Sequence, residues 1–309
     1  MLVALGLLAA GALVLYVGAE AAVRGAAGLA RTLGIRPFLL GALLFGIDVE
    51  SLGAAVAAAA RGETALAAGQ IVGTVLFLYG AAFGAALIVS RRPVPAPQPL
   101  LVLMPAAHLV AGAFAVGDRY VARLEGAFLV VMYLAYVGLL LRVRRTPAGV
   151  TEIEREAAEA PRSASLTAGL TIGGLAMVAV GAAVVVGGAT RFVAVTGLAA
   201  GFVGAAVLGV LVSLDEVLLE VLPVRRGTPE LATGNLFGTL PAFAAGALGL
   251  AALVRPLTVD SAAASGYLAV AFLYSLVATV FLVRGRAGRW LGGFVLLCYA
   301  GWVVVASML

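Results

Sequence analysis

The sequence of 309 residues contains no lysine, one cysteine (Cys298) and one histidine (His108), and only 11% of its residues are charged. A metal centre built from thiolates or imidazoles needs several such side chains, so this class of site is excluded. Soluble globular proteins have about a quarter of their residues charged, which excludes a typical soluble enzyme. All 20 basic residues are arginines scattered along the chain, a distribution that argues against a nucleic-acid surface.

Apolar residues, in contrast, make up 63% of the chain, and the mean hydropathy is +1.13. A transmembrane helix needs about 20 predominantly apolar residues. Ten such stretches follow one another, at about 2–19, 37–60, 64–89, 99–117, 125–141, 166–189, 197–222, 228–254, 262–283 and 289–309. The sequence therefore predicts an all-α polytopic membrane protein with about ten transmembrane helices.

The long polar segment from Arg142 to Arg162 divides these spans into five and five. We expect a first five-helix repeat over 1–141, a cytoplasmic linker over 142–165 and a second five-helix repeat over 166–309. Loops after odd-numbered spans carry 15 of the 20 arginines, so the positive-inside rule places both termini outside and the linker in the cytoplasm. An odd number of spans per repeat gives the two halves inverted topology, as in many secondary transporters of bacterial or archaeal inner membranes.

An internal repeat supports this division. Residues 69–74 read GQIVGT and residues 234–239 read GNLFGT, at a constant offset of 165. Asn235 is the only asparagine and Gln70 is one of two glutamines. Because such rare amides fall at equivalent positions, we interpret the match as a true repeat.

Four carboxylates lie deep in apolar spans, where a charge is costly and usually marks a pathway or a site. Asp48 and Glu50 lie in the second span, and Asp215 and Glu216 in the seventh. With no lysine to neutralise them, these acids predict an all-oxygen site for a hard cation such as Ca²⁺, Mg²⁺ or Na⁺. The neighbouring hydroxyls and amides have two interpretations, ion ligands or ordinary hydrogen bonds between helices.

Two further features near these acids are expected to matter. Glu220 falls four residues after Glu216, towards the cytoplasmic end of the span, where it is either a mouth residue of the pathway or an interfacial one. Gly204 and Gly209 precede the second acidic motif. They indicate either a broken helix with exposed carbonyls or close helix packing through small residues.

These motifs resemble those of the cation/calcium exchanger superfamily, whose repeats carry Gly-Thr-Ser-x-Pro-Glu and then Gly-Asn-x-x-Gly-Ser. Here residues 213–216 read SLDE and residues 234–239 read GNLFGT, whereas the first repeat, with GIDVES at 46–51, matches less well. Leu78 and Phe243 stand where the family has an asparagine or aspartate that completes its ion sites. The resemblance implies two inverted repeats, a mid-membrane cation site and rocking of spans 1 and 6 against the rest.

The resulting hypothesis is a secondary-active cation antiporter, not an enzyme, that exchanges a divalent cation, Ca²⁺ first of all, for Na⁺ or H⁺. It needs no cofactor, and its partners are the lipid bilayer and small cations. The alternatives are a proton-coupled exchanger of another cation, or a transport-inactive membrane protein that uses this fold to bind a partner. The predicted cation ligands are Asp48, Glu50, Ser51, Gln70, Thr74, Ser213, Asp215, Glu216, Asn235 and Thr239.

Overall fold

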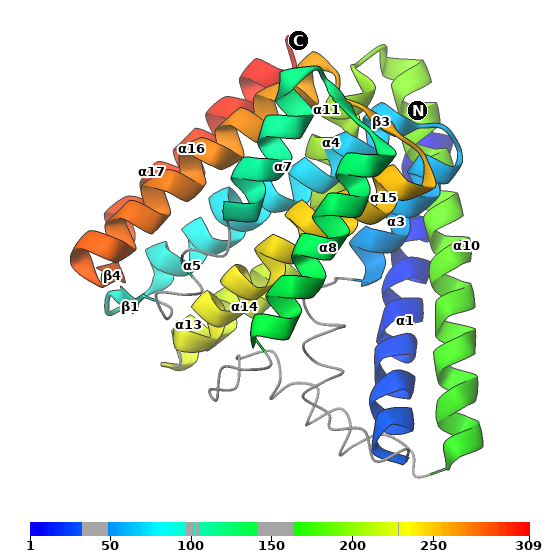
Figure 1. Ribbon diagram of the computed structural model, residues 1–309, viewed down its shortest axis with the longest axis horizontal. Coiled ribbons are helices and arrows are strands. Elements are labelled where there is room, and N and C mark those ends of the chain that lie inside the picture. Colours follow the sequence, from blue (N-terminus) through cyan, green and yellow to red (C-terminus); the bar gives the residue numbers. More distant parts are fainter. Residues whose placement is uncertain (33–48, 97–101, 103–105, 141–162, 228) are drawn as a thin grey trace.

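The protein is a bundle of membrane helices (Figure 1). The computed structural model describes residues 1–32, 49–96, 102, 106–140, 163–227 and 229–309. The first half contains α1 (Leu2–Thr32), α3 (Val49–Ala60), α4 (Thr64–Leu76), the π-helical η1 (Phe77–Ala82), α5 (Phe83–Val89), β1 (Val94–Pro95), α7 (Ala106–Gly117), β2 (Tyr120–Val121) and α8 (Arg123–Leu140).

The second half repeats this order of elements. It contains α10 (Ala164–Thr196), α11 (Ala200–Val203), the π-helical η2 (Gly204–Leu208), α12 (Gly209–Leu211), α13 (Glu216–Arg226), α14 (Pro229–Pro241), the π-helical η3 (Ala242–Ala247), α15 (Leu248–Val254), β3 (Leu257–Thr258), α16 (Ser261–Arg284), β4 (Arg286–Ala287) and α17 (Arg289–Ala306).

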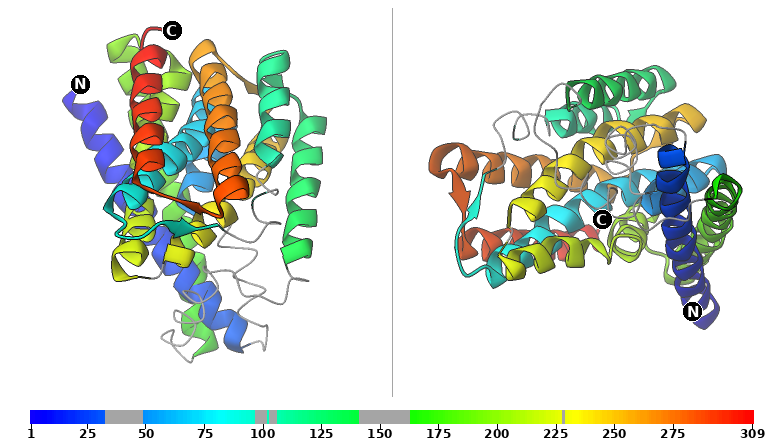
Figure 2. Two further views of the ribbon diagram at one scale, coloured as in Figure 1. Left: turned by 90° about the vertical axis from the view of Figure 1, so that its left-hand side faces the viewer. Right: turned by 90° about the horizontal axis from the view of Figure 1, so that it is seen from below.

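Six helices of the described chain are long and apolar enough to cross a membrane, and α11–α12 together with α13 form a seventh, bent by 47°. The shorter apolar helices α3 and α7, together with α8, lie where the sequence predicts three further spans. The prediction of a polytopic all-α membrane protein is therefore confirmed. The termini lie at one end of the molecule (Figures 1 and 2), as an even number of spans requires.

The third spans of the two halves match element by element. The series α4, η1 and α5 and the series α14, η3 and α15 have the same lengths, and every boundary is offset by 165 residues. Both contain a π-helical segment at the same point, where the wider turn shifts the helix face. The structure thus carries the repeat that the rare amides Gln70 and Asn235 indicated.

Equivalent elements also exchange partners between the halves. Strand β1 pairs with β4, and β2 pairs with β3, so each ribbon joins one half to the other. In the same way α17 packs on α5, where Gly292 meets Gly84, and α8 packs on α15, where Gly126 meets Gly249. The halves are interlocked around a pseudo-two-fold axis, which is how inverted repeats build one transporter core.

The first helices of the two halves, α1 and α10, form an antiparallel pair at one side of the molecule (Figure 1). Glycines recur every seven residues on both, at Gly11, Gly18 and Gly25 of α1 and at Gly174, Gly181 and Gly188 of α10. A side chain at any of them would meet the backbone of the partner helix at 3.0 Å or less. Small residues let membrane helices approach closely, so α1 and α10 pack as one unit.

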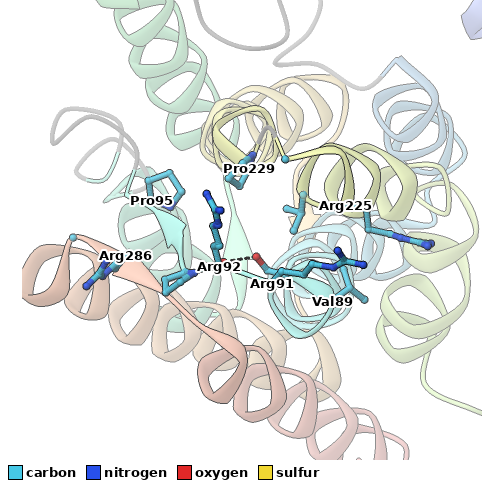
Figure 3. A pocket seen from close by; sticks show the side chains of 12 residues that line it. Val89, Arg91, Arg92, Pro95, Arg225, Pro229 and Arg286 are labelled. Carbon is cyan, nitrogen blue, oxygen red and sulfur yellow. Dashed lines mark hydrogen bonds between the residues drawn. The ribbon is translucent and has the colours of Figure 1, made fainter.

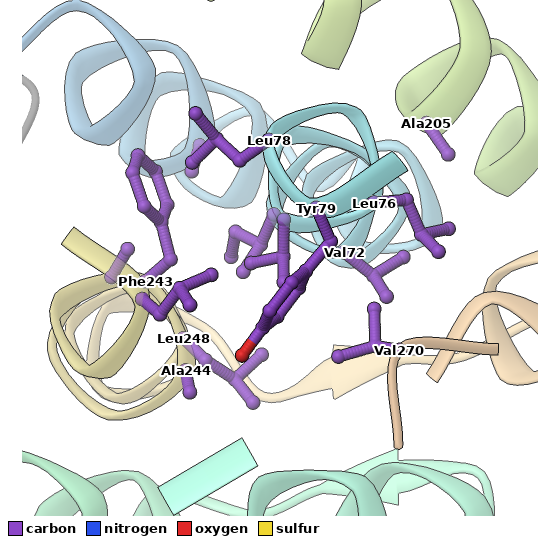
Figure 4. Close-up of a cluster of buried hydrophobic side chains, with 14 of the residues drawn as sticks. Val72, Leu76, Leu78, Tyr79, Ala205, Phe243, Ala244, Leu248 and Val270 are labelled. Atoms are coloured by element: carbon purple, nitrogen blue, oxygen red, sulfur yellow. The ribbon is translucent and has the colours of Figure 1, made fainter. Parts of the chain in front are cut away.

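Apolar side chains fill the centre between α4, η1, η3 and their neighbours (Figure 4). Leu78 and Phe243, at equivalent positions of η1 and η3, belong to this core, with 0% and 1% of their surface exposed. The two positions where the exchanger superfamily has polar ligands are therefore apolar packing positions here.

Candidate cation-binding site

Three hydroxyl groups from three segments meet inside the protein. Ser51 lies in the first turn of α3, Thr74 in the last turn of α4 and Ser213 in the turn between α12 and α13. The Oγ atom of Ser213 lies 3.2 Å from Oγ1 of Thr74 and 3.5 Å from Oγ of Ser51. All three side chains are fully buried. We call these residues the hydroxyl cluster.

The break between α12 and α13 turns backbone oxygens towards this cluster. The N–H of Ser213 donates to Val210 and that of Glu216 to Ser213, so neither reaches the carbonyl four residues earlier as an α-helix requires. The carbonyl oxygens of Gly209 and Val212 instead accept from Thr74 (3.4 Å) and Ser51 (3.5 Å). Unwound backbone of this kind supplies cation ligands at membrane depth.

Glycines allow α4 to reach this point. A Cβ atom on Gly204 would lie 2.3 Å from the carbonyl oxygen of Leu66, and one on Gly209 would lie 2.8 Å from the amide nitrogen of Thr74. Of the two interpretations of these glycines, close packing and a broken helix, the structure shows both. Contact with α4 at Gly204 and Gly209 places Thr74 beside the break.

Gln70 extends the cluster by one turn of α4. Its side-chain Nε2 donates to Oγ1 of Thr74 at 3.3 Å, whereas its Oε1 has no hydrogen-bond partner among the described residues. Since Gln70 is fully buried, this oxygen is a desolvated acceptor on a side chain that contacts the hydroxyl cluster through Thr74. A buried polar atom without a partner is costly, and a bound cation is one way to satisfy it.

A pair of carboxylates, Glu216 and Glu220, follows Ser213 in the chain, and the backbone N–H of Glu216 donates to the carbonyl oxygen of Ser213. The Nδ2 atom of Asn235 donates to Oε2 of Glu216 at 2.8 Å and to Oε1 of Glu220 at 3.2 Å. Glu216 is the first residue of α13, where the positive end of the helix dipole favours an anion. Residues four apart share a helix face, so Glu220 follows Glu216 along the side that faces α14.

Glu220 is more deeply buried than the sequence indicated. It is 0% exposed, and its Oε2 has no hydrogen-bond partner in the described chain. The signal that points to it is the spacing of four from Glu216. Hydropathy does not reveal this burial, because the 47° bend and the packing of α13 against α5 and α14 are not visible in the sequence.

Glu50 and Asp215, which are equivalent to each other at the repeat offset of 165, form a second pair of acids. Both are half-buried, Glu50 in the first turn of α3 and Asp215 in the turn before α13. Both interact electrostatically with the hydroxyl of Tyr16 on α1. This second pair of acids is therefore near the α1–α10 pair.

Two predicted ligands are less well placed by the structure. Thr239 is buried on α14, one turn after Asn235. The second is Asp48. At the repeat offset of 165 it is equivalent to Ser213, the residue that Thr74 contacts. Asp48 lies outside the described residues.

The donor set as a whole is made of oxygen atoms. In the described part of the chain, no group of three or more His, Cys, Asp or Glu side chains comes together. The available donors are therefore two carboxylates together with hydroxyl, amide and backbone carbonyl oxygens. Hard cations such as Ca²⁺ bind six to eight oxygens of these types. His108, buried against the ring of Tyr79, takes no part in the set.

Comparison with known proteins gives a family match over most of the chain. The family model described as "Sodium/calcium exchanger protein" matches residues 3–142 and 166–308. The inner membrane protein YrbG of Escherichia coli is 27% identical over 323 residues, which cover 100% of this chain and 97% of YrbG.

Two solved structures share the fold. The sodium-calcium exchanger NCX_Mj has a TM-score of 0.61 and 20% identity, and the alignment covers 100% of this chain and 99% of that one. The H⁺/Ca²⁺ exchanger CAX has a TM-score of 0.74 and 15% identity, covering 99% and 85%.

Proposed function

Since this chain belongs to the sodium/calcium exchanger family, we propose that it is a secondary-active antiporter that exchanges a divalent cation, Ca²⁺ first of all, for Na⁺ or H⁺. The observation that carries the proposal is the hydroxyl cluster, which joins helices of both halves, together with the carboxylate pair held by Asn235. The backbone N–H of Glu216 donates to the carbonyl oxygen of Ser213, which links the pair to the cluster. Asp48, Glu50, Asp215 and Thr239 complete the proposed set of ligands. The transported ions are substrates, and no cofactor is needed.

Exchange follows from the chemistry of the carboxylates. A divalent cation neutralises Glu216 and Glu220, and without it the same charges attract Na⁺ or H⁺. A site that is neutral only when occupied favours movement of the loaded protein, because an uncompensated charge at membrane depth is costly. The divalent cation and the Na⁺ or H⁺ then compete for one site instead of moving together.

The α1–α10 pair is the proposed moving element. Its two long helices pack on each other through glycines and approach the rest of the protein chiefly through α3, where Gly53 meets Val178. Glu50 of α3 and Asp215 are close enough to Tyr16 of this pair to act on its hydroxyl group electrostatically. Rocking of the pair would thus open the site to one side of the membrane and then to the other. We place the protein in the inner membrane of a bacterium or archaeon, with both termini outside.

One observation favours a proton-coupled version of this exchange. Leu78 and Phe243 remove the polar ligands that the exchanger superfamily has at these points, whereas the buried Glu220 adds a carboxylate. Fewer neutral ligands disfavour the binding of several Na⁺ ions, and carboxylates accept protons. We therefore carry H⁺/Ca²⁺ exchange as the second candidate.

The test is ⁴⁵Ca²⁺ flux into proteoliposomes under an imposed Na⁺ gradient and, separately, an imposed pH gradient. We expect flux with the wild type and a loss of at least tenfold with Glu216→Gln. Glu20→Gln serves as the control, because Glu20 is an exposed acid that pairs with Arg24 on the surface. Flux under the pH gradient alone supports the proton-coupled version. No wild-type flux under either gradient would refute antiport and leave a partner-binding protein.

A further inference from the structure

A cavity of about 910 Å³ lies at the end of the molecule where α5 and α13 stop and α14 begins. Figure 3 shows its lining, with the ribbon of β1 and β4 forming one wall. Its size falls in the range of small-molecule sites, roughly 300–1,000 Å³. None of its lining residues is a predicted cation ligand, and the proposed transport cycle does not use it.

Four arginines line this cavity, which we call the arginine pocket. Arg91 and Arg92 follow α5, Arg225 lies in the last turn of α13 and Arg286 lies in β4. Arg92 projects between Pro95 and Pro229, with Arg91 and Arg225 on one side and Arg286 on the other (Figure 3). The arginines therefore come from both halves of the repeat.

Among the residues that the structure describes, no acidic side chain balances this charge. The lining contains no aspartate or glutamate, and none of the four arginines forms an ion pair with a carboxylate of the described chain. Topology explains why arginines stand at these span ends. It does not require four of them to surround one cavity, where like charges repel.

We propose that the arginine pocket binds a phosphate-bearing anion. A guanidinium group offers a planar set of donors that matches phosphate oxygens, and basic pockets between membrane helices hold lipid head groups. Val89 and Val224 add apolar surface to the lining, which suits the glycerol part of a phospholipid. Free inorganic phosphate has the same anionic chemistry without the apolar part.

The position of the arginine pocket gives the bound anion a role in exchange, which rests on the function proposed above. Val224, in its lining, follows Glu220 by one turn of α13, and Pro229 begins the helix that carries Asn235. Uncompensated positive charge at the end of these two helices opposes the passage of cations. A bound anion cancels that charge and is expected to speed up exchange.

The binding experiment uses the purified full-length protein and does not depend on transport. Native mass spectrometry measures retention of dioleoylphosphatidylglycerol, and thermal unfolding in neutral detergent measures the shift caused by inorganic phosphate. The test variant is Arg92→Gln/Arg225→Gln. The control, Arg123→Gln/Arg191→Gln, removes the same charge from exposed positions outside the pocket.

We expect at least tenfold weaker anion binding in the test variant and binding within about twofold of the wild type in the control. Lipid retention without a phosphate shift identifies a head group as the ligand, and the reverse identifies a soluble phosphate. Equal binding in both variants, or binding of neither probe, overturns the proposal. The unfolding temperature without added anion shows whether the test variant is folded.

A second experiment measures transport in proteoliposomes. Phosphatidylglycerol should raise the flux of the wild type more than that of the test variant. If binding behaves as expected and only this transport experiment fails, only the role in exchange is refuted.

Discussion

Replacing Glu220 with glutamine removes one negative charge from the carboxylate pair while keeping the size of the side chain. The distances from Asn235 Nδ2 to the two carboxylates place Oε2 of Glu216 and Oε1 of Glu220 no more than about 6 Å apart. A Ca²⁺ ion with ligands at ~2.3–2.6 Å bridges oxygens up to about 5 Å apart, so only a small movement is needed. Glu220→Gln therefore tests whether both acids hold one ion.

The size of the effect follows from the lost charge. A carboxylate and a divalent cation about 4 Å apart attract each other by about 8 kcal/mol at an effective dielectric constant of ~20, twice the value for two unit charges. Desolvation of both charges offsets most of this attraction, and the amide oxygen of glutamine or a water molecule replaces the missing ligand. A net loss of about 2 kcal/mol gives roughly a 30-fold increase in the Ca²⁺ dissociation constant.

Isothermal titration of Ca²⁺ into the detergent-solubilised protein measures this constant for the wild type, Glu220→Gln and the control Glu20→Gln. Thermal unfolding without Ca²⁺ checks that the variants are folded. A dissociation constant for Glu220→Gln within twofold of the wild-type value would refute the assignment of Glu220 to the cation site. Its burial would then serve only the hydrogen bond from Asn235.

Two further predictions concern packing and ion coupling. Gly73→Ala places a Cβ atom 2.2 Å from the Cα of Ala205, which cannot rotate away, and should cost about 1–3 kcal/mol, measured as a lower unfolding temperature. Gly293→Ala, with nothing within 4 Å, is the matched helical control and should be neutral or stabilising by up to about 1 kcal/mol; an equal loss in both would contradict the close contact. Phe243→Asn restores a polar side chain at η3 and should increase the Na⁺-driven share of ⁴⁵Ca²⁺ flux relative to the pH-driven share, whereas Phe243→Leu should not. An unchanged ratio in both would show that this position does not set the coupling ion.

Much of the fold was predictable because membrane insertion depends on local composition. Each apolar stretch identifies a span by itself, since the bilayer requires about 20 apolar residues wherever the span lies in the sequence. The repeat was predictable because Gln70 and Asn235 are rare in this chain, and the helix boundaries of α4 and α14 now show the same offset. The lengths of α1 and α10, which extend well beyond their apolar stretches, were not predicted.

The candidate site was predictable in its chemistry but only partly in its membership. Acids within apolar spans are costly enough to be informative one residue at a time, so Glu216 stood out. The burial of Glu220 was not predicted, because it depends on the packing of α13 against α5 and α14 and not on the position of the residue along the apolar stretch. The orientation of the termini remains a prediction from the arginine count.

The sequence by itself determined that this is a ten-span membrane protein with an inverted repeat and an excess of intramembrane acids, because hydropathy, rare residues and charge are local properties. Only the tertiary structure decided which oxygens meet: Ser51, Thr74 and Ser213 in one cluster, and Glu216 and Glu220 around Asn235. It also gathered arginines that are far apart in the sequence around one cavity. The physical reason is that these contacts depend on how the two halves interlock and on where α13 bends away from α12, which are relations between segments.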